Sequence, residues 1–449
     1  MAHLIRHQVK RLTVLIPEKH LMGQITELLM MRELPQIPER IWNQMKAIPL
    51  AMALMLMFRK TTAWQIRRMD RMRNNSREPL EIYIHIPFCV KKCAYCDFLS
   101  GPSGEERQQA YFKALKKEIR NVEDFSGRPV VSVFMGGGTP SVPDSRLTGE
   151  ILDEIQTKFM MAPDAEITIE ANPGTLSMKK LKDYRSHGVN RLSMGLQSPK
   201  EQELKKLGRI HTWEEFLENY SNAREVGFSN INVDLMFAIP GQKPEGWREN
   251  LRTVAALGPE HISAYSLIIE EGTPFADMEL DLPDEDQEYE MYEDTVSILG
   301  EYGYRQYEIS NYGKPGFACR HNKGYWQRTD YLGLGLGASS LLGDERFSNT
   351  SDMEEYLIKS GRPDKIRVNS EKLTIEDKMA EFMFLGLRMT DGVEREKFRQ
   401  CFDRDIEEVY GKVLKKYKDL LLLREKNGRI FLTRKGIHVS NTVMADFLI

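Results

Sequence analysis

Three of the five cysteines stand close together in the sequence, at Cys89, Cys93 and Cys96. Their spacing, Cys-x3-Cys-x2-Cys, allows a short loop to present three thiolates to three irons of a cubane iron–sulfur cluster. The fourth iron then lacks a protein ligand and stays open, as the open position of a catalytic metal site does. Two alternatives are a zinc site, for which Asp97 is a mediocre fourth ligand, and plain core cysteines. The spacing alone leaves these alternatives open.

Further candidates for chemistry stand where predicted strands end. The run Gly136-Gly137-Gly138-Thr139-Pro140 directly follows the apolar segment 130–135, and glycines let a backbone approach a ligand closely. Glu170 ends the alternating segment 166–170. A glycine triplet often only turns the chain, and a glutamate at a strand end can equally be a surface charge. These residues therefore indicate a site only in combination with others.

The elements that must position these residues alternate in type from Pro79 onward. The pattern predicts helices at 105–124, 147–159, 176–187 and 200–207, and strands at 81–86, 130–135, 166–170, 190–194, 230–236 and 261–267. Repeated βα units of this kind form a parallel sheet with helices outside it. Six units are too few for a closed eight-stranded barrel. Ligands of such sheets bind beyond the carboxyl ends of the strands, where the cysteines and glycines fall.

The cysteine block resembles the signature of the radical S-adenosylmethionine (SAM) superfamily, in which SAM chelates the open iron. The stretch Tyr83 to Cys89 and the tail Cys96-Asp97-Phe98 are similar to the oxygen-independent coproporphyrinogen-oxidase-like branch. In that branch the dehydrogenases carry a further cysteine two residues after the third. Phe98 at this position is typical of the sister group, the haem chaperones called HemW. The resemblance extends from about Pro79 to the C-terminus.

The resemblance implies a fold, cofactors and site residues. The fold is an α/β, incomplete (three-quarter, six-unit) parallel βα barrel that is open laterally. The cofactors are SAM, haem and a [4Fe–4S] cluster on Cys89, Cys93 and Cys96. Its implied SAM contacts are Tyr83, Gly136, Gly137, Gly138, Thr139, Glu170, Gln197, Arg209 and Asp234.

The function implied is that of a chaperone, which holds haem and delivers it to haemoproteins such as membrane respiratory enzymes. A reductant such as flavodoxin or ferredoxin supplies electrons to the cluster. The alternative is the dehydrogenase, which decarboxylates two propionates of coproporphyrinogen III. Phe98 and the unrelated N-terminal segment count against it. The sequence leaves open which residues are catalytic, whether turnover uses radical chemistry, which protein receives the haem, and the oligomeric state.

Residues after the sixth strand carry one more candidate site. The segment 304–312 alternates like a strand, and His321-Asn322-x-x-Tyr325-Trp326 resembles the His-Asn-x-x-Tyr-Trp motif of the haem-chaperone group. We expect His321 to ligate haem iron between aromatic rings, with Cys319 as the second candidate. The alternative is a capped turn in which His321 and Asn322 bond only to the backbone.

The same pattern predicts the domain boundaries. The partial barrel spans 79–310, and a post-barrel segment with the His-Asn-x-x-Tyr-Trp motif spans 311–373. Residues 374–449 form a small winged-helix-like domain with a hairpin wing at 428–436. The glycine-rich stretch 332–340 lacks the Gly-Lys-Ser/Thr of a phosphate loop, and we expect close packing there.

Composition describes an ordinary globular protein, with 41% hydrophobic and 29% charged residues and a net charge of −3. No broad basic footprint for nucleic acid is present. Clustered cysteines without a disulfide pattern favour a reducing compartment, and we expect the cytoplasm.

Residues 1–78 differ in composition from the rest of the chain, because they hold ten of the 23 methionines. Their apolar run at 48–58 is too short to span a bilayer. We expect this extension to lie outside the fold, with translation starting at Met69 or Met72. The alternative is an amphipathic membrane-surface segment.

Overall fold

Six parallel strands form the centre of the fold in the computed structural model, which describes residues 78–448. Each strand pairs in parallel with the next along the chain. The six are β1 (Leu80–Ile86), β2 (Val130–Gly137), β3 (Met161–Ala171), β4 (Arg191–Gln197), β5 (Ile231–Phe237) and β6 (His261–Ser266). The predicted succession of βα units is confirmed. The expectations for the N-terminal segment fall outside the described residues.

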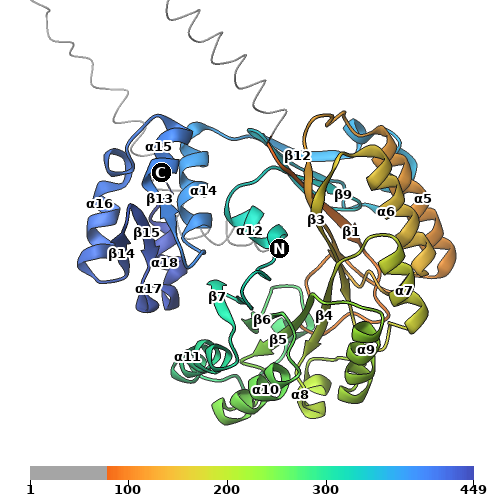
Figure 1. Ribbon diagram of the computed structural model, residues 1–449, viewed down its shortest axis with the longest axis horizontal. Coiled ribbons are helices and arrows are strands. Elements are labelled where there is room, and N and C mark those ends of the chain that lie inside the picture. The colour runs from red at the N-terminus through yellow and green to blue at the C-terminus, as the bar shows by residue number, and fades with distance from the viewer. Residues whose placement is uncertain (1–77, 449) are drawn as a thin grey trace, which may run out of the picture. The chain divides into compact units, whose positions relative to one another are not determined.

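Helices cover the outer face of this curved sheet (Figure 1). They are α5 (Glu105–Asn121), α6 (Ser145–Lys158), α7 (Met178–Ser186), α8 (Glu201–Lys206), α9 (Trp213–Glu225) and α10 (Pro244–Ala256). Strand β1 shows why the two faces differ. Leu80, Ile82, Ile84 and Ile86 are fully buried in the hydrophobic core. Side chains alternate along a strand, so the intervening Glu81, Tyr83 and His85 face the inside of the barrel, which is polar.

Additional strands extend the sheet on both sides. Strand β9 (Tyr331–Leu334) pairs in parallel with β1, and β10 (Ser339–Leu342), β11 (Glu345–Asn349) and β12 (Arg367–Lys372) follow it in antiparallel order. On the other side β6 pairs with β8 (Asn311–Gly313), and β8 pairs with β7 (Arg305–Glu308). Within residues 78–448 the strand order ends at β12 and β7, so the barrel is partial, as predicted.

The prediction of one strand at 304–312 is wrong, because this segment is the hairpin formed by β7 and β8. The Glu308 carboxylate folds over the turn and accepts hydrogen bonds from the Ser310 backbone N–H and the Asn311 side chain. A side chain that bonds to the backbone two residues later stabilises a turn in place of an extended chain. Period-2 alternation on both arms made the two short strands resemble one long strand.

Helix α12 (Arg320–Trp326) lies inside the curve of the sheet, on the face opposite the outer helices (Figure 1). Its N-terminus is bound by Glu166 near the start of the regular part of β3. The Glu166 Oε1 atom accepts hydrogen bonds from the backbone N–H groups of Arg320 (2.9 Å) and His321 (3.3 Å). A carboxylate at this position satisfies free N–H groups and complements the helix dipole. The helix therefore fills the barrel near the amino-terminal ends of the strands.

The C-terminal region forms a winged-helix-like unit. Its helices are α14 (Ile375–Gly386), α15 (Arg395–Phe402), α16 (Ile406–Asp419), α17 (Arg434–His438) and α18 (Ser440–Ala445), and its sheet has the order β13 (Val393–Glu394), β15 (Arg429–Leu432), β14 (Leu423–Lys426). The wing turns at Asn427-Gly428, with φ angles of 53° and 73° that suit a tight hairpin turn. The wing thus starts at Leu423, earlier than the predicted 428–436. Helices α11 (Glu285–Glu301) and α13 (Met353–Lys359) complete the main elements.

Candidate functional site

The three clustered cysteines lie on the loop that joins β1 to α5. Two backbone hydrogen bonds close the base of this loop, from the Cys89 N–H to the Gly101 carbonyl and from the Gly101 N–H to the Pro87 carbonyl, both 3.0 Å. Its tip is attached elsewhere, because the Ala94 N–H donates to the Leu207 carbonyl at 3.4 Å. All three cysteines are partly exposed. The loop therefore presents its thiols at the carboxyl-terminal edge of the sheet.

The surroundings of the thiols fit an iron–sulfur cluster. Burial, together with the nearby Cys93 and Cys89 sulfurs, raises the pKa of the Cys96 thiol to about 11, so metal binding there must displace a proton. Within residues 78–448 no three His, Cys, Asp or Glu side chains are arranged to hold one metal ion. A cubane binds each thiolate through a different iron, so its sulfurs need not share one coordination sphere. Three partly exposed thiols on one loop therefore fit the predicted cluster.

The glycine run after β2 approaches its neighbours too closely for any side chain. A Cβ atom on Gly136 would lie 2.9 Å from the Glu170 Oε2 atom, and one on Gly138 would lie 2.7 Å from the Phe88 carbonyl oxygen. Gly137 has a φ of +110°, and its Cβ would lie 2.5 Å from the His85 ring. The Gly137 N–H donates to Glu170 Oε2 at 3.3 Å. The glycines thus bring backbone groups to the edge of the site, beside the cysteine loop.

Two carboxyl groups face the inside of the barrel below this edge. Burial, together with the negative charge of Asp234, raises the pKa of Glu170 to about 7. Burial also raises the pKa of Asp234, although hydrogen bonds from Asn232 and Ser193 oppose this increase. The buried Arg191 guanidinium already lowers both pKa values in part, and a cationic ligand beside the two carboxyl groups would lower them further. The amino group and sulfonium of SAM have this chemistry.

The other predicted contacts lie at the same end of the sheet. Gln197, at the end of β4, has a φ of +69° and accepts a hydrogen bond of 2.7 Å from the Tyr265 hydroxyl. Tyr83 bonds through its hydroxyl to His85 Nδ1 at 3.0 Å. Arg209 follows α8 and reaches the Cys93 sulfur. The structure therefore brings together the cysteines, glycines, Thr139, Tyr83, Glu170, Gln197, Arg209 and Asp234.

One residue near this site was missed by the sequence analysis. Asn172, directly after β3, bonds to both Thr139 and Arg209. Its position after the strand-end residues Glu170 and Ala171 was the available signal. Asparagine before proline is also common in ordinary turns, so the sequence alone could not distinguish the two.

His321 lies apart from this site, on α12 inside the barrel. Its side chain is 2% exposed, and Nδ1 bonds to the Ser132 hydroxyl at 2.9 Å while the ring stacks on Phe134. Ser132 is near the start of β2, at the end of the sheet opposite the cysteines. The other candidate, Cys319, is fully buried and its thiol contacts Glu166. Both residues are enclosed by the protein in this structure. The capped-turn alternative is wrong, since the segment is a buried helix.

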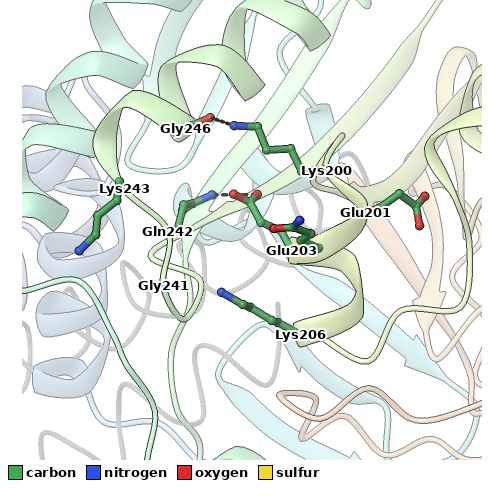
Figure 2. A pocket seen from close by; sticks show the side chains of 9 residues that line it. Lys200, Glu201, Glu203, Lys206, Gly241, Gln242, Lys243 and Gly246 are labelled. Carbon is green, nitrogen blue, oxygen red and sulfur yellow. Dashed lines mark hydrogen bonds between the residues drawn. The ribbon is translucent and has the colours of Figure 1, made fainter.

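A cavity of about 590 Å³ lies between α8 and the loop before α10 (Figure 2). Two of the lysines that line it donate hydrogen bonds to backbone carbonyls. Lys200 Nζ donates to the Gly246 carbonyl at 3.2 Å. Lys206 Nζ donates to the Pro240 carbonyl at 2.6 Å. The buried Glu203 carboxylate accepts a hydrogen bond from Gln242 at 3.1 Å. These bonds hold α8 in place, and the next residue, Leu207, binds the cysteine loop.

Comparison with known proteins agrees with this fold and site. The family model of the Radical SAM superfamily matches residues 83–254, and that of the HemN C-terminal domain matches residues 373–439. Escherichia coli coproporphyrinogen III oxidase (HemN), described as a radical SAM enzyme, superposes with a TM-score of 0.73 at 25% identity. The match covers 83% of this chain and 91% of that chain. The fold and site thus define a radical SAM protein.

Curated relatives show which group of radical SAM proteins the chain is similar to. The heme chaperone HemW of Bacillus subtilis is 36% identical over 82% of this chain and 98% of its own length. HemW of Lactococcus lactis is 36% identical, over 83% and 98% respectively. HemW of Escherichia coli is 43% identical over 58% of this chain and 69% of its own length. The chain therefore belongs to the HemW family.

Proposed function

We propose that this protein is a haem chaperone that binds haem, a [4Fe–4S] cluster and SAM, and delivers haem to haemoproteins such as membrane respiratory enzymes. The observation that carries this proposal is the match to nearly the full length of the Bacillus subtilis heme chaperone. Phe98 supports it, because the dehydrogenases of this branch have a cysteine at that position. The proposed location is the cytoplasm, with flavodoxin or ferredoxin as reductant. No helix among residues 78–448 is long and apolar enough to cross a membrane.

The side chains of the site have separate roles in this proposal. The thiolates of Cys89, Cys93 and Cys96 hold the cluster. When bound, the cluster supplies one electron for the reductive cleavage of SAM. The carboxylates of Glu170 and Asp234 attract the SAM amino group, and Arg209 suits its carboxylate because a guanidinium offers paired donors. The role of Arg209 toward SAM competes with its present bonds, which include the Cys93 sulfur.

His321 stays the predicted ligand of the haem iron, with its Nε2 atom lacking a hydrogen-bond partner among residues 78–448. His321 and Cys319 are enclosed by the barrel, at 2% and 0% exposure. Imidazole or thiolate must reach the iron directly, so haem binding at either residue requires the surrounding groups to move.

The proposed function is tested by supplying both porphyrin substrates to anaerobically reconstituted protein. One sample receives haem, and the other receives coproporphyrinogen III with SAM and dithionite. We expect a shifted Soret band and haem that co-elutes with the protein, with no decarboxylated product. Formation of protoporphyrinogen IX at many turnovers per chain would instead identify the dehydrogenase.

A matched control is Cys93→Ala. Wild-type protein should hold about four irons and four sulfides per chain, and the variant should lose the cluster with its broad visible absorbance. A single tightly bound zinc without sulfide in the wild-type protein would contradict the proposed cluster.

A further inference from the structure

A continuous chain of side-chain hydrogen bonds links two of the three clustered sulfurs. The Thr139 hydroxyl donates to the Cys89 sulfur at 3.6 Å and accepts from the Asn172 Nδ2 group at 2.9 Å. On the other side, Asn172 Oδ1 accepts from Arg209 Nη2 at 2.7 Å. Arg209 Nη1 then donates to the Cys93 sulfur at 3.7 Å. Asn172 thus lies at the centre, with one donor directed at each sulfur.

The hydrogen-bond partners determine the orientation of every side chain in this series of hydrogen bonds. The Asn172 oxygen must face the guanidinium, which only donates, so its nitrogen faces Thr139. The Thr139 oxygen accepts from that nitrogen, which leaves its single proton for the Cys89 sulfur. A flipped amide would place two donors against each other at Arg209.

The backbone around Asn172 is also held in place. Its N–H donates to the Ser141 hydroxyl at 3.2 Å, and its carbonyl accepts from the Thr175 N–H at 3.1 Å. Gly195 provides the space beside the amide, since a Cβ atom there would lie 3.0 Å from Asn172 Oδ1 and 3.3 Å from Arg209 Nη2. The amide is therefore fixed before any cofactor binds.

Hydrogen bonds to ligand sulfurs are one of the ways in which proteins set the potential of an iron–sulfur cluster. Reduction adds one electron to the cluster and moves no proton, so the sulfurs become more negative. A donor at the sulfur then stabilises the reduced cluster more than the oxidised cluster. Residues that orient such donors act on the metal indirectly.

We propose that Asn172 is a positioning residue, which in the protein without SAM holds the Thr139 and Arg209 donors on the Cys89 and Cys93 sulfurs and thereby raises the reduction potential of the cluster. This inference rests on the cluster of the proposed function. It adds to that proposal a residue with no expected contact to SAM and a measurable effect on electron acceptance.

The test is a redox titration of the reconstituted protein with dithionite, followed by electron paramagnetic resonance and carried out without SAM. Thr139→Val should make reduction about tenfold less favourable, which is a decrease of about 59 mV for one electron. Thr139→Ser keeps the hydroxyl and should restore a potential close to that of the wild type. Asn172→Leu has a similar volume and should lower the potential at least as much as Thr139→Val, because both donors lose their support.

Thr148→Val is the matched control. Thr148 is buried on α6, and its hydroxyl has no partner among residues 78–448. Its loss should leave the potential unchanged. If iron-loaded Asn172→Leu or Thr139→Val titrates like the wild type, the inference is wrong. If Asn172→Leu fails to fold, the comparison of Thr139→Val with Thr139→Ser decides it. Absence of iron and sulfide from the wild-type protein would instead reject the cluster of the proposed function.

Discussion

At the scale of single residues, burial gives Glu170 an unusual protonation behaviour. Removal from water disfavours the charged carboxylate and raises the pKa of Glu170 to about 7, with Asp234 adding to the increase. Most carboxyl groups already lose their proton at a pH well below 7. Glu170 therefore changes charge in the physiological range, where a cationic ligand can shift the balance.

SAM binding should consequently depend on pH. Below a pH of about 7, Glu170 in the free protein is mostly protonated and cannot attract the SAM amino group. We expect SAM affinity to fall roughly tenfold between about pH 8 and about pH 6, as one protonation with this pKa requires. Equilibrium binding measured by calorimetry checks this. Glu170→Gln should bind SAM weakly, with an affinity that does not change with pH. If the SAM affinity of that variant depends on pH as in the wild type, another group is responsible for the titration.

At the scale of elements, α12 shows how closely a helix can pack inside a barrel. Gly324 faces Glu81 of β1, and a Cβ atom at this glycine would lie 2.1 Å from the Glu81 carboxyl oxygen. Burial raises the pKa of Glu81 well above its usual value. The contact is possible only because residue 324 has no side chain.

Gly324→Ala should therefore destabilise the protein. The added methyl group overpacks a buried contact, and we expect a loss of about 2–3 kcal/mol in the free energy of unfolding. Gly300→Ala on α11 is the matched control, because nothing lies within 4 Å of its Cβ position. Alanine is the better helix former, so this change should be neutral or stabilise by up to about 1 kcal/mol. Urea unfolding measures both, and equal effects would contradict the close packing of α12.

His321→Ala should likewise reduce stability. The change removes the bond to Ser132 and the stacking on Phe134, and it leaves a cavity in the barrel. We expect a loss of about 2–4 kcal/mol in unfolding free energy. Iron content should be unchanged, because the cysteines lie at the other end of the sheet. A His321→Ala variant with wild-type stability and no iron would show instead that His321 supports the iron site and not the fold.

At the scale of the whole molecule, contacts distant in sequence join the winged-helix-like region to the partial barrel. The Arg388 guanidinium lies 4.3 Å from the centre of the Trp326 ring and forms an ion pair with Glu308 at 3.5 Å. Both charged residues are buried, so each would be costly without the other. The residues from Pro79 onward thus form one compact unit, with their own hydrophobic core and their own internal contacts.

A chain that starts at Met72 should therefore fold without the preceding residues. We expect the same unfolding midpoint, iron content and SAM affinity as for the full chain. Circular dichroism during heating and iron analysis of the two proteins check this. Insoluble or iron-free shortened protein, beside a sound full chain, would show that the fold or its cofactors need the earlier segment.

Local sequence patterns were sufficient for the six parallel strands and the cysteine loop, while most of the predicted site residues came from the family resemblance. Alternation and βα succession depend on neighbouring residues, and the cysteines and glycines follow the strands that present them. Because parallel strands all end at one edge, residues as separate as Cys89, Glu170 and Arg209 could be assigned to the same end of the sheet.

Only the tertiary structure decided the positions that depend on distant partners. His321 stands in a motif that suggests a ligand, yet its environment is made by Ser132, which is 189 residues earlier. Asn172 resembles a turn residue until Thr139 and Arg209, 33 and 37 residues away, are seen on its two sides. The physical reason is the same in both cases. A side chain acts through the groups that surround it, and folding brings those groups from separate strands and loops.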